Sequence, residues 1–368
     1  MNTRLLLSLC LCAMGCSSSK GVMDAATDAD AGQGDIAEDA DTGAGADSGP
    51  SVWDGGSPFV PSDGSQIDLL LVTDSEAIAS AYLGVPIPWI ASALLELRAD
   101  LDLRLAVLNP DLGDPMGLEC PPPDAESSRL AEGVDGTLWV DVRSDTSRQE
   151  IAREVQARSG YSCGFQQPFD ALLSATLPTY AEIETNAVQH QGDAENADFF
   201  RRDAFLAVVI ITTPDDCSFA EYLDQPADFP PGARCVAHPE QLRPIRHYHD
   251  ALLSVRPADT FGFFVIAGLP AELSGQTPEV VLADSRMTSD RPFELNLTGS
   301  ESWSSDEPLF SSRANATPSR RLVELAGELL ESGVRVGVFS QATSSEVAEA
   351  DDAFQLAAQP IARAILGL

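Results

Sequence analysis

Short apolar runs alternate with amphipathic segments along most of the chain, beginning near residue 66. Residues 67–72 form the first run, which is typical of a strand buried on both faces of a sheet. Similar runs predict strands at 101–108, 204–212, 261–267 and 334–339, and a short edge strand at 137–142. Apolar positions at helical spacing predict helices at 89–97, 148–158, 240–255, 320–330 and 354–366.

This alternation of strands and helices predicts an α/β fold, with a mainly parallel central sheet covered by helices on both faces. Ligands of such sheets bind outside the carboxyl ends of the strands. Function is therefore expected in the loops after Val72, Leu108, Thr212 and Ala267. Three longer segments, near 109–165, 214–239 and 268–318, are expected to be insertions.

The first residues carry the pattern of an export signal. Arg4 supplies a positive charge, a short leucine-rich stretch follows, and small residues precede Cys16. The stretch is too short to span a bilayer, so residues 1–15 are predicted to be a cleaved signal peptide. Its end resembles a bacterial lipobox, which implies that Cys16 becomes the acylated first residue of a lipoprotein. An ordinary secretory signal and a secreted protein are the alternative.

Acylation of Cys16 would anchor the protein stably, because each buried CH₂ of an acyl chain contributes about 0.8 kcal/mol. Ser17, by resemblance to sorted lipoproteins, implies the outer membrane. Residues 16–65 are rich in Asp, Ala, Gly, Ser and Thr, and no basic residue lies between Lys20 and Arg98. We expect an acidic, disordered tether here, followed by one domain over residues 66–368.

Composition narrows the classes of partner. The chain has 368 residues, 44% of them hydrophobic, which is enough to bury a sizeable core. Its formal net charge of -35 repels phosphate backbones, so nucleic-acid binding is not expected. Anionic lipid surfaces are repelled as well, so contact with a membrane is expected through the lipid anchor alone.

Seven cysteines divide into two groups. Cys10 and Cys12 leave with the signal, and Cys16 takes the lipid. An even number of cysteines remains in an exported chain, which favours two disulfide bonds, and four cysteines allow three pairings. The pairs closest in sequence are Cys217–Cys235 and Cys120–Cys163. A zinc site using Cys235 and His238 is the competing interpretation, but the chain has no Cys-x-x-Cys pair.

Three stretches, at 109–113, 163–168 and 196–218, are similar to segments of bacterial lipoproteins and secreted proteins that carry the von Willebrand factor type A (VWA) fold. The resemblance covers the chain from Gln66 to its end and is most specific at 196–218. It implies a VWA-like, Rossmann-like domain. Members of this family hold a divalent cation with an Asp-x-Ser-x-Ser motif after the first strand and an aspartate after the fourth, because Mg²⁺ prefers hard oxygen ligands.

The corresponding positions depart from that pattern. Asp74 matches the first aspartate, but Glu76 and Ile78 stand where the serines belong, and Thr213 stands where the second aspartate belongs. One interpretation is a rewired cation site built from Asp74, Glu76, Asp215 and Asp216. The interpretation we favour is a degenerate site with no metal or other cofactor, in which these carboxylates are solvated at loop tips.

No catalytic motif stands out. The chain contains no Gly-x-Ser-x-Gly elbow, no P-loop and no dinucleotide-binding glycine fingerprint. Its four histidines are His190, His238, His247 and His249. The last two flank Tyr248 on a predicted helix, where residues two apart face different directions, so a surface pair is expected rather than a metal site.

The sequence therefore predicts a cell-envelope lipoprotein whose VWA-like domain binds an unidentified protein partner without metal and without catalysis. Two alternatives stay open. One is an envelope enzyme such as a hydrolase, with its site in the strand-end loops or in the segment 268–318. The other is a divalent-cation-dependent adhesion domain with rewired ligands.

Overall fold

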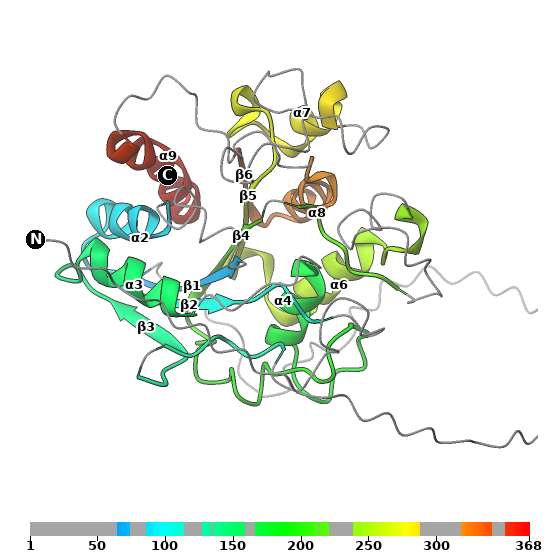
Figure 1. Ribbon diagram of the computed structural model, residues 1–368, viewed down its shortest axis with the longest axis horizontal. Helices are drawn as coiled ribbons and strands as arrows, with labels where there is room; N and C mark the ends of the chain where they lie inside the picture. Colours follow the sequence, from blue (N-terminus) through cyan, green and yellow to red (C-terminus); the bar gives the residue numbers. More distant parts are fainter. Residues whose placement is uncertain are drawn as a thin grey trace, which may run out of the picture. The chain divides into compact units, whose positions relative to one another are not determined.

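The computed structural model describes residues 65–73, 86–113, 127–133, 135–158, 166–212, 214–220, 238–287, 318–340 and 350–368. These residues form an α/β fold, in which one mostly parallel sheet lies between two layers of helices (Figure 1). The predicted α/β class and the mainly parallel sheet are confirmed.

The sheet has six strands in the order β3-β2-β1-β4-β5-β6. Five strands are parallel, and β3 runs antiparallel to β2. The short strand β3 lies at one edge of the sheet, as predicted. The strands are β1 (Gln66–Thr73), β2 (Asp102–Leu108), β3 (Trp139–Val142), β4 (Phe205–Ile211), β5 (Phe261–Ala267) and β6 (Arg335–Ser340).

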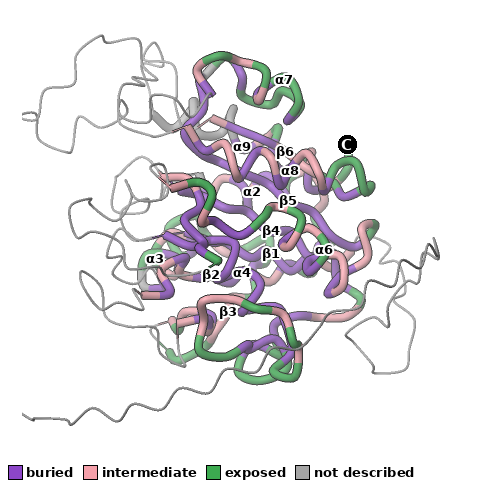
Figure 2. The backbone as a smooth tube through the Cα atoms, turned by 90° about the vertical axis from the view of Figure 1, so that its right-hand side faces the viewer, coloured by how far each residue is buried: buried purple, intermediate pink, exposed green. Residues whose placement is uncertain are grey.

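The central strands are apolar on both faces because helices cover both faces. Every residue of β4 and β5 is buried. Leu70 and Val72 of β1 point into one core, whereas Leu69 and Leu71 point into the other. This arrangement explains why the strands appear in the sequence as continuous apolar runs rather than as alternating patterns. Figure 2 shows the buried residues concentrated in the strands and in the inner sides of the helices.

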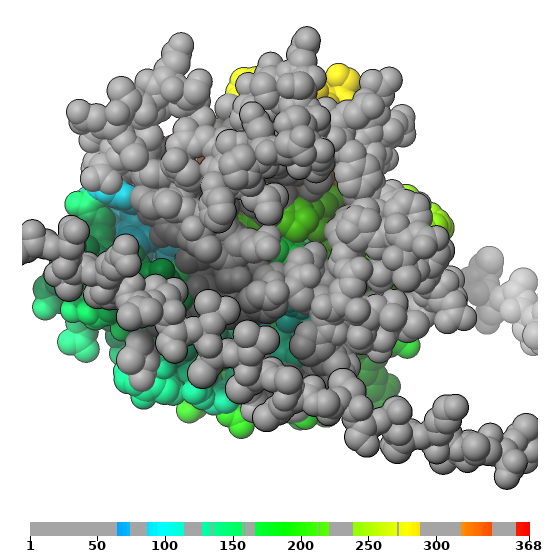
Figure 3. Space-filling view, viewed as in Figure 1, coloured from blue at the N-terminus to red at the C-terminus, as the bar shows by residue number. Residues whose placement is uncertain are grey.

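Helices α2 (Pro86–Leu97), α3 (Arg148–Arg158) and α9 (Ala350–Leu366) cover one face of the sheet (Figure 1). The opposite face carries α4 (Pro168–Thr176), α6 (Ile245–Val255) and α8 (Arg320–Glu331), and α7 (Pro278–Ala283) packs on α8. Short 3-10 turns lie at Pro239–Gln241, Ala258–Thr260, Ala271–Leu273 and Ser285–Met287. Figure 3 gives the surface in the view of Figure 1, with the yellow atoms of the region around α7 at its upper edge.

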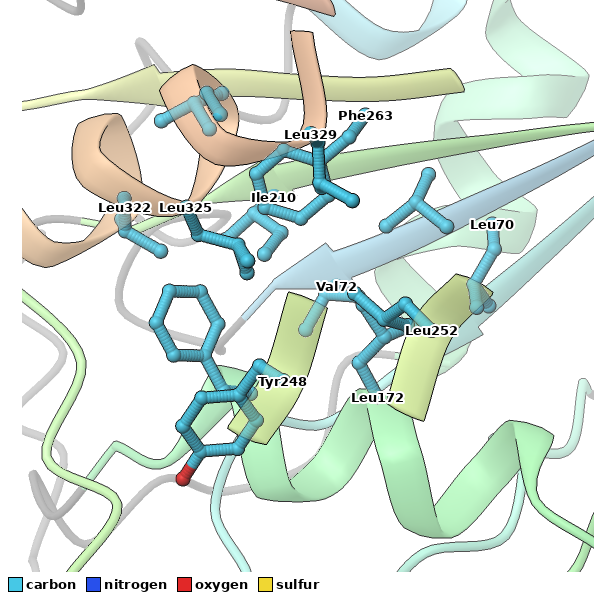
Figure 4. Close-up of a cluster of buried hydrophobic side chains, with 14 of the residues drawn as sticks. Leu70, Val72, Leu172, Ile210, Tyr248, Leu252, Phe263, Leu322, Leu325 and Leu329 are labelled. Atoms are coloured by element: carbon cyan, nitrogen blue, oxygen red, sulfur yellow. The ribbon is translucent and has the colours of Figure 1, made fainter. Parts of the chain in front are cut away.

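The core on the α4, α6 and α8 side contains Tyr248 among aliphatic side chains (Figure 4). Leu322, Leu325 and Leu329 recur at helical spacing along α8 and face the sheet residues Ile210 and Phe263. The ring of Tyr248 belongs to this core, but its hydroxyl oxygen points away from the cluster. That oxygen is the link between the apolar core and the polar network described below.

The structure differs from the predicted elements at two helices. The helix predicted over 240–255 begins only at Ile245, because Pro244 has no amide hydrogen to donate and adopts an extended conformation at the N-cap (φ -58°, ψ 141°). Helix α4 is not predicted at all, although Pro168 at its first position and the spacing of Phe169, Leu172 and Leu173 are helix signals. Helix α7 lies inside the segment 268–318 that we interpret as an insertion. None of the helices that the structure describes is long and apolar enough to cross a membrane.

Candidate functional site

The loop after β4 is the described part of the predicted strand-end site. Asp74, Glu76, Ile78 and Thr213 lie outside the described residues, so the site is built here from Asp215 and Asp216 and from what surrounds them. This loop lies at the carboxyl end of the central strand, where the fold class places ligands. Its two carboxylates reach the first turns of two different helices.

Asp216 is fully buried and binds the N-terminus of α4. Its Oδ1 accepts a hydrogen bond from the backbone N of Phe169 at 3.1 Å and one from Oγ of Ser218 at 2.7 Å. Its Oδ2 accepts from the backbone N of Ser218 and from Nε of Arg321, both at 3.2 Å. A carboxylate offers about four lone-pair positions, so all of the acceptor capacity of Asp216 is used inside the protein.

Asp215 caps α8 in the same way. Its Oδ2 accepts from the backbone N of Arg321 at 2.9 Å, and its Oδ1 accepts from the backbone N of Leu322 at 3.3 Å and of Asp216 at 2.9 Å. The amides of Arg321 and Leu322 belong to the first turn of α8, where N–H groups have no partner within the helix. Burial raises the pKa of Asp215 to about 7, although Arg321 opposes that shift.

A third carboxylate, Asp170, lies in the first turn of α4 and contacts Tyr248 of α6. It is fully buried, and it accepts hydrogen bonds from the hydroxyl of Tyr248 and from the backbone N of Asn186, both at 2.8 Å. Nε of Arg243 lies 3.6 Å from its Oδ2. Burial raises the pKa of Asp170 to about 7, and the charge of Asp216 raises it further, while Arg243 and Tyr248 lower it.

These groups form one network, which we call the strand-end network: Asp170, Asp215, Asp216, Ser218, Arg243, Tyr248 and Arg321. The two arginines are linked, because Nη2 of Arg321 donates to the backbone O of Arg243 at 2.8 Å. Three carboxylates face two guanidinium groups, so one negative charge is left without a cationic partner when all three ionise. That excess is a second physical reason, beside burial, why the pKa values of Asp170 and Asp215 are raised.

The expectation that Asp215 and Asp216 are solvated at loop tips is wrong. Asp216 is 0% exposed, and the carboxylate of Asp215 is taken up by helix amides. The reason is that the first turns of α4 and α8 both need acceptors, and the loop after β4 passes between them. Asp170, Arg243 and Arg321 were missed in the sequence, because Arg321 is 105 residues from Asp216 and no local spacing connects them. The one available signal was Asp170, an acidic residue in the first turn of α4.

A second buried ion pair holds the opposite end of the sheet. Asp68 on β1 is fully buried and accepts from Nε of Arg201 at 2.7 Å and from the backbone N of Arg201 at 2.8 Å. Arg256 donates to the backbone O of Arg201 at 2.7 Å. This cluster binds the segment before β4 to β1, so we assign it to stability.

The cysteines are described only in part. Cys217 is buried and disulfide-bonded, and every other cysteine, including Cys16, Cys120, Cys163 and Cys235, lies outside the described residues. The pairing therefore stays a prediction.

Three of the four histidines each contact a different partner. His247 and His249 both lie on α6, as predicted, and Nε2 of His247 is 2.9 Å from the backbone O of Glu184 whereas Nε2 of His249 is 2.7 Å from Oγ of Ser332. His238 pairs with Glu240 at 3.3 Å, and burial lowers the pKa of His190. Within the described ranges no three His, Cys, Asp or Glu side chains are arranged to hold a metal ion.

A hollow of about 390 Å³ opens on the surface beside the strand-end network. It is formed by the irregular segment 179–190 and by Arg243, whose guanidinium pairs with Asp170 of the network. Ala181, Ile183 and Val188 give it an apolar lining, and Glu184 stands at its side. No feature of the sequence marks this segment as a surface depression.

Comparisons of the chain with protein-family models, with curated proteins and with solved structures found no match.

Proposed function

We propose that this protein is a cell-envelope lipoprotein, anchored through Cys16, whose VWA-like domain binds another protein through the loops at the carboxyl ends of its strands. The observation that carries the proposal is the strand-end network. It fastens the loop after β4 to the first turns of α4 and α8, and so holds a defined surface at the place where α/β folds bind their ligands. A surface that is already ordered loses less conformational entropy on binding.

The binding that we propose does not use a metal ion. Each carboxylate oxygen of Asp216 accepts two hydrogen bonds. The guanidinium of Arg321, with Nε at 3.2 Å, supplies the positive charge that a metal ion would otherwise supply. A divalent cation would have to displace these donors, and hard cations need several free oxygen ligands at once. Adhesion through a rewired cation site is therefore the weaker alternative.

Calorimetric titration of the full chain with Mg²⁺, Mn²⁺ and Ca²⁺ tests this point. We expect no one-to-one binding in the micromolar range. An Arg321→Met variant is the matched comparison, since it removes the competing guanidinium and leaves Asp215 and Asp216 in place. Micromolar binding by the wild-type chain that is lost in Asp74→Ala would contradict the proposal.

An envelope enzyme is the other alternative. The raised pKa values of Asp170 and Asp215 resemble those of catalytic acids. Asp170, however, is fully buried, and its oxygens are bonded to Tyr248 and Asn186. The oxygens of Asp215 are bonded to the backbone amides of Arg321, Leu322 and Asp216. We therefore assign these shifts to the packing of the network rather than to catalysis.

The anchor is tested by metabolic labelling with palmitate. We expect label in the wild-type chain and none in Cys16→Ala, which should leave the membrane fraction. Label that persists in Cys16→Ala would contradict acylation at this residue.

The partner is tested by affinity capture from envelope extracts. The bait is the full chain carrying Cys16→Ala, with and without a chelator. We expect a partner that is retained above a control protein and is insensitive to chelation. No retained protein, or retention that needs a divalent cation, would count against the proposal.

A further inference from the structure

The segment 179–198 presents an acidic surface, with no lysine or arginine in its own sequence. It contains Glu182, Glu184, Asp193, Glu195 and Asp198, and all five are exposed. The side chain of Glu184 is 84% exposed and pairs with Arg243 at the hollow that both residues line, with 3.4 Å between Oε2 and Nη1. Arg129 pairs with Glu195 at 3.5 Å, so two guanidinium groups face the five carboxylates of the segment and the surface keeps an excess of negative charge.

The same segment exposes apolar side chains. Tyr180 is 60% exposed and Val188 is 59% exposed, and they are two of the five large hydrophobic residues that are exposed in the described part of the chain. Val188 lines the hollow together with Ala181 and Ile183. Exposed and half-buried positions alternate along residues 181–185. Glu182 and Glu184 are exposed, and the residues between and beside them are half-buried.

This surface is held in shape although it has no regular secondary structure. Asn196 is fully buried, accepts from the backbone N of Leu130 at 2.9 Å, and donates to the backbone O of Ser128 and Ala175, both at 3.1 Å. The backbone N of Gln191 donates to the backbone O of Ser174 at 2.7 Å. The segment is thus bonded to α4 and to the loop at 128–130, so the hollow exists before any ligand arrives.

Asn186 connects this segment to the strand-end network. Its Nδ2 donates to the backbone O of Phe219 in the loop after β4, at 3.1 Å, and its backbone N donates to Asp170. His247 on α6 fixes the backbone O of Glu184 from the other side. The acidic surface therefore continues the strand-end surface of the proposed function rather than standing apart from it.

We propose that the hollow and its acidic rim bind an extended, basic segment of a protein partner, in which lysine or arginine alternates with small apolar residues. This inference rests on the proposed function and names the chemistry of the partner. Basic side chains would meet Glu182 and Glu184, and apolar side chains would lie against Val188 and Tyr180. The net charge of -35 draws a cationic segment toward the domain at long range.

Other occupants fit less well. A second copy of the chain carries the same net charge of -35 and would be repelled. The chain's own segment between Lys20 and Arg98 contains no basic residue, so it cannot supply the charge. Nucleic acids and anionic lipids are repelled for the reason given above.

Two synthetic peptides test the proposal, one of alternating lysine and valine and one of alternating glutamate and valine. Fluorescence anisotropy with the full chain carrying Cys16→Ala should detect binding of the first peptide and not of the second. The double variant Glu182→Gln, Glu184→Gln should weaken binding about fivefold, as expected for the loss of two exposed ion pairs. Val188→Ser should weaken it as well, without changing the net charge.

The matched control is Glu279→Gln, Glu331→Gln, which removes the same charge from two exposed positions on α7 and α8. It should change the affinity less than about twofold, because exposed charges at a distance are screened by salt. Carbodiimide cross-links between the peptide lysines and the protein should map to Glu182 and Glu184. Equal weakening by both double variants, or cross-links spread over other acidic residues, would overturn the proposal.

The capture experiment separates this inference from the proposed function. A partner that is retained equally by the wild-type chain and by Glu182→Gln, Glu184→Gln would leave the proposed function standing and remove this surface from it. Peptide binding at this surface without any retained envelope protein would support the surface as a site for basic segments and would count against the proposed function.

Discussion

Arg321 is expected to contribute more to stability than any exposed arginine of this domain. Its guanidinium donates to Asp216 at 3.2 Å and to the backbone O of Arg243 at 2.8 Å, and its side chain is only 14% exposed. In Arg321→Met the flexible apolar side chain keeps packing contacts near Phe169, whereas the charge and both hydrogen bonds are lost. Asp216 is then a buried carboxylate without its cation.

The cost can be worked from these contacts. Removing one partner of a buried ion pair costs about 3–5 kcal/mol, and an unpaired buried backbone acceptor costs about 1–3 kcal/mol. The two terms overlap, because they describe the same guanidinium, and the partial exposure of Arg321 lets water replace some of the loss. We therefore expect the free energy of unfolding to fall by about 3 kcal/mol.

Urea unfolding near pH 8, where Asp170 and Asp215 are mostly ionised, measures this change. Arg246→Met is the matched control, because Arg246 is 81% exposed and pairs with Asp250 at 3.4 Å along the surface of α6. Its loss should cost less than about 0.5 kcal/mol. The double variant Arg321→Met, Asp216→Asn completes a mutant cycle, in which the coupling between the two side chains should exceed about 1 kcal/mol.

Two results would refute this reasoning. If Arg321→Met costs no more than Arg246→Met, the guanidinium does not stabilise the buried carboxylate. If the effects of Arg321→Met and Asp216→Asn simply add, the two side chains do not interact and the network is not one unit.

The remaining predictions concern pH, a buried amide and two glycines. The folded-state pKa of Asp170 is about 7 against an ordinary value of 3.8, so between those values the folded chain holds a proton that the unfolded chain has released. The stabilisation that Asp170 provides is therefore complete below about pH 4 and is lost as the pH rises toward 7. The free energy of unfolding falls by up to about 1.4 kcal/mol per pH unit in this range. Urea midpoints measured from about pH 5 to about pH 8 should fall more steeply in the wild-type chain than in Asp170→Asn, and parallel profiles would contradict the assignment. Asn196→Ala should lower the free energy of unfolding by about 3 kcal/mol, because it leaves the backbone groups of Leu130, Ser128 and Ala175 without their hydrogen-bond partner. Gln189→Ala at an exposed position is the control and should cost less than about 0.5 kcal/mol. Similar losses in both variants would show that Asn196 does not hold the segment. Gly327→Ala in α8 should raise the thermal midpoint, since its new methyl group would meet Cβ of Pro278 at an ordinary 3.6 Å and alanine favours a helix by about 0.8–1 kcal/mol. Gly192→Ala should lower it, since the methyl group would collide with the backbone O of Thr176, and a higher midpoint in this variant would show that the segment can shift.

The sequence by itself determined the fold class. Apolar runs long enough for strands, separated by amphipathic segments, leave few arrangements other than a parallel sheet between two layers of helices. The positions of β1, β4, β5 and β6 follow from those runs, and so does the short edge strand β3. These features are local, because whether a strand is buried on both faces can be read from its own residues.

The two errors in the predicted helices have different causes. The predicted helix at 240–255 contains Pro244, whose effect on the helix start is a local rule that was available in the sequence. Helix α4 has only nine residues, and both its ends are bound by tertiary contacts, since Asp216 accepts from an amide of its first turn and Asn196 donates to a carbonyl of its last turn. Short helices owe most of their stability to such contacts rather than to propensity.

The site was decided by tertiary structure alone. The sequence places Asp215 and Asp216 in a strand-end loop, but it does not tell whether they face solvent, a metal ion or other parts of the chain. The fold brings Arg321 to them from an element that begins far away in the sequence, and the unsatisfied amides of α4 and α8 donate to their oxygens. Burial and charge pairing depend on which segments meet, so no pattern within a short stretch of sequence could have predicted them.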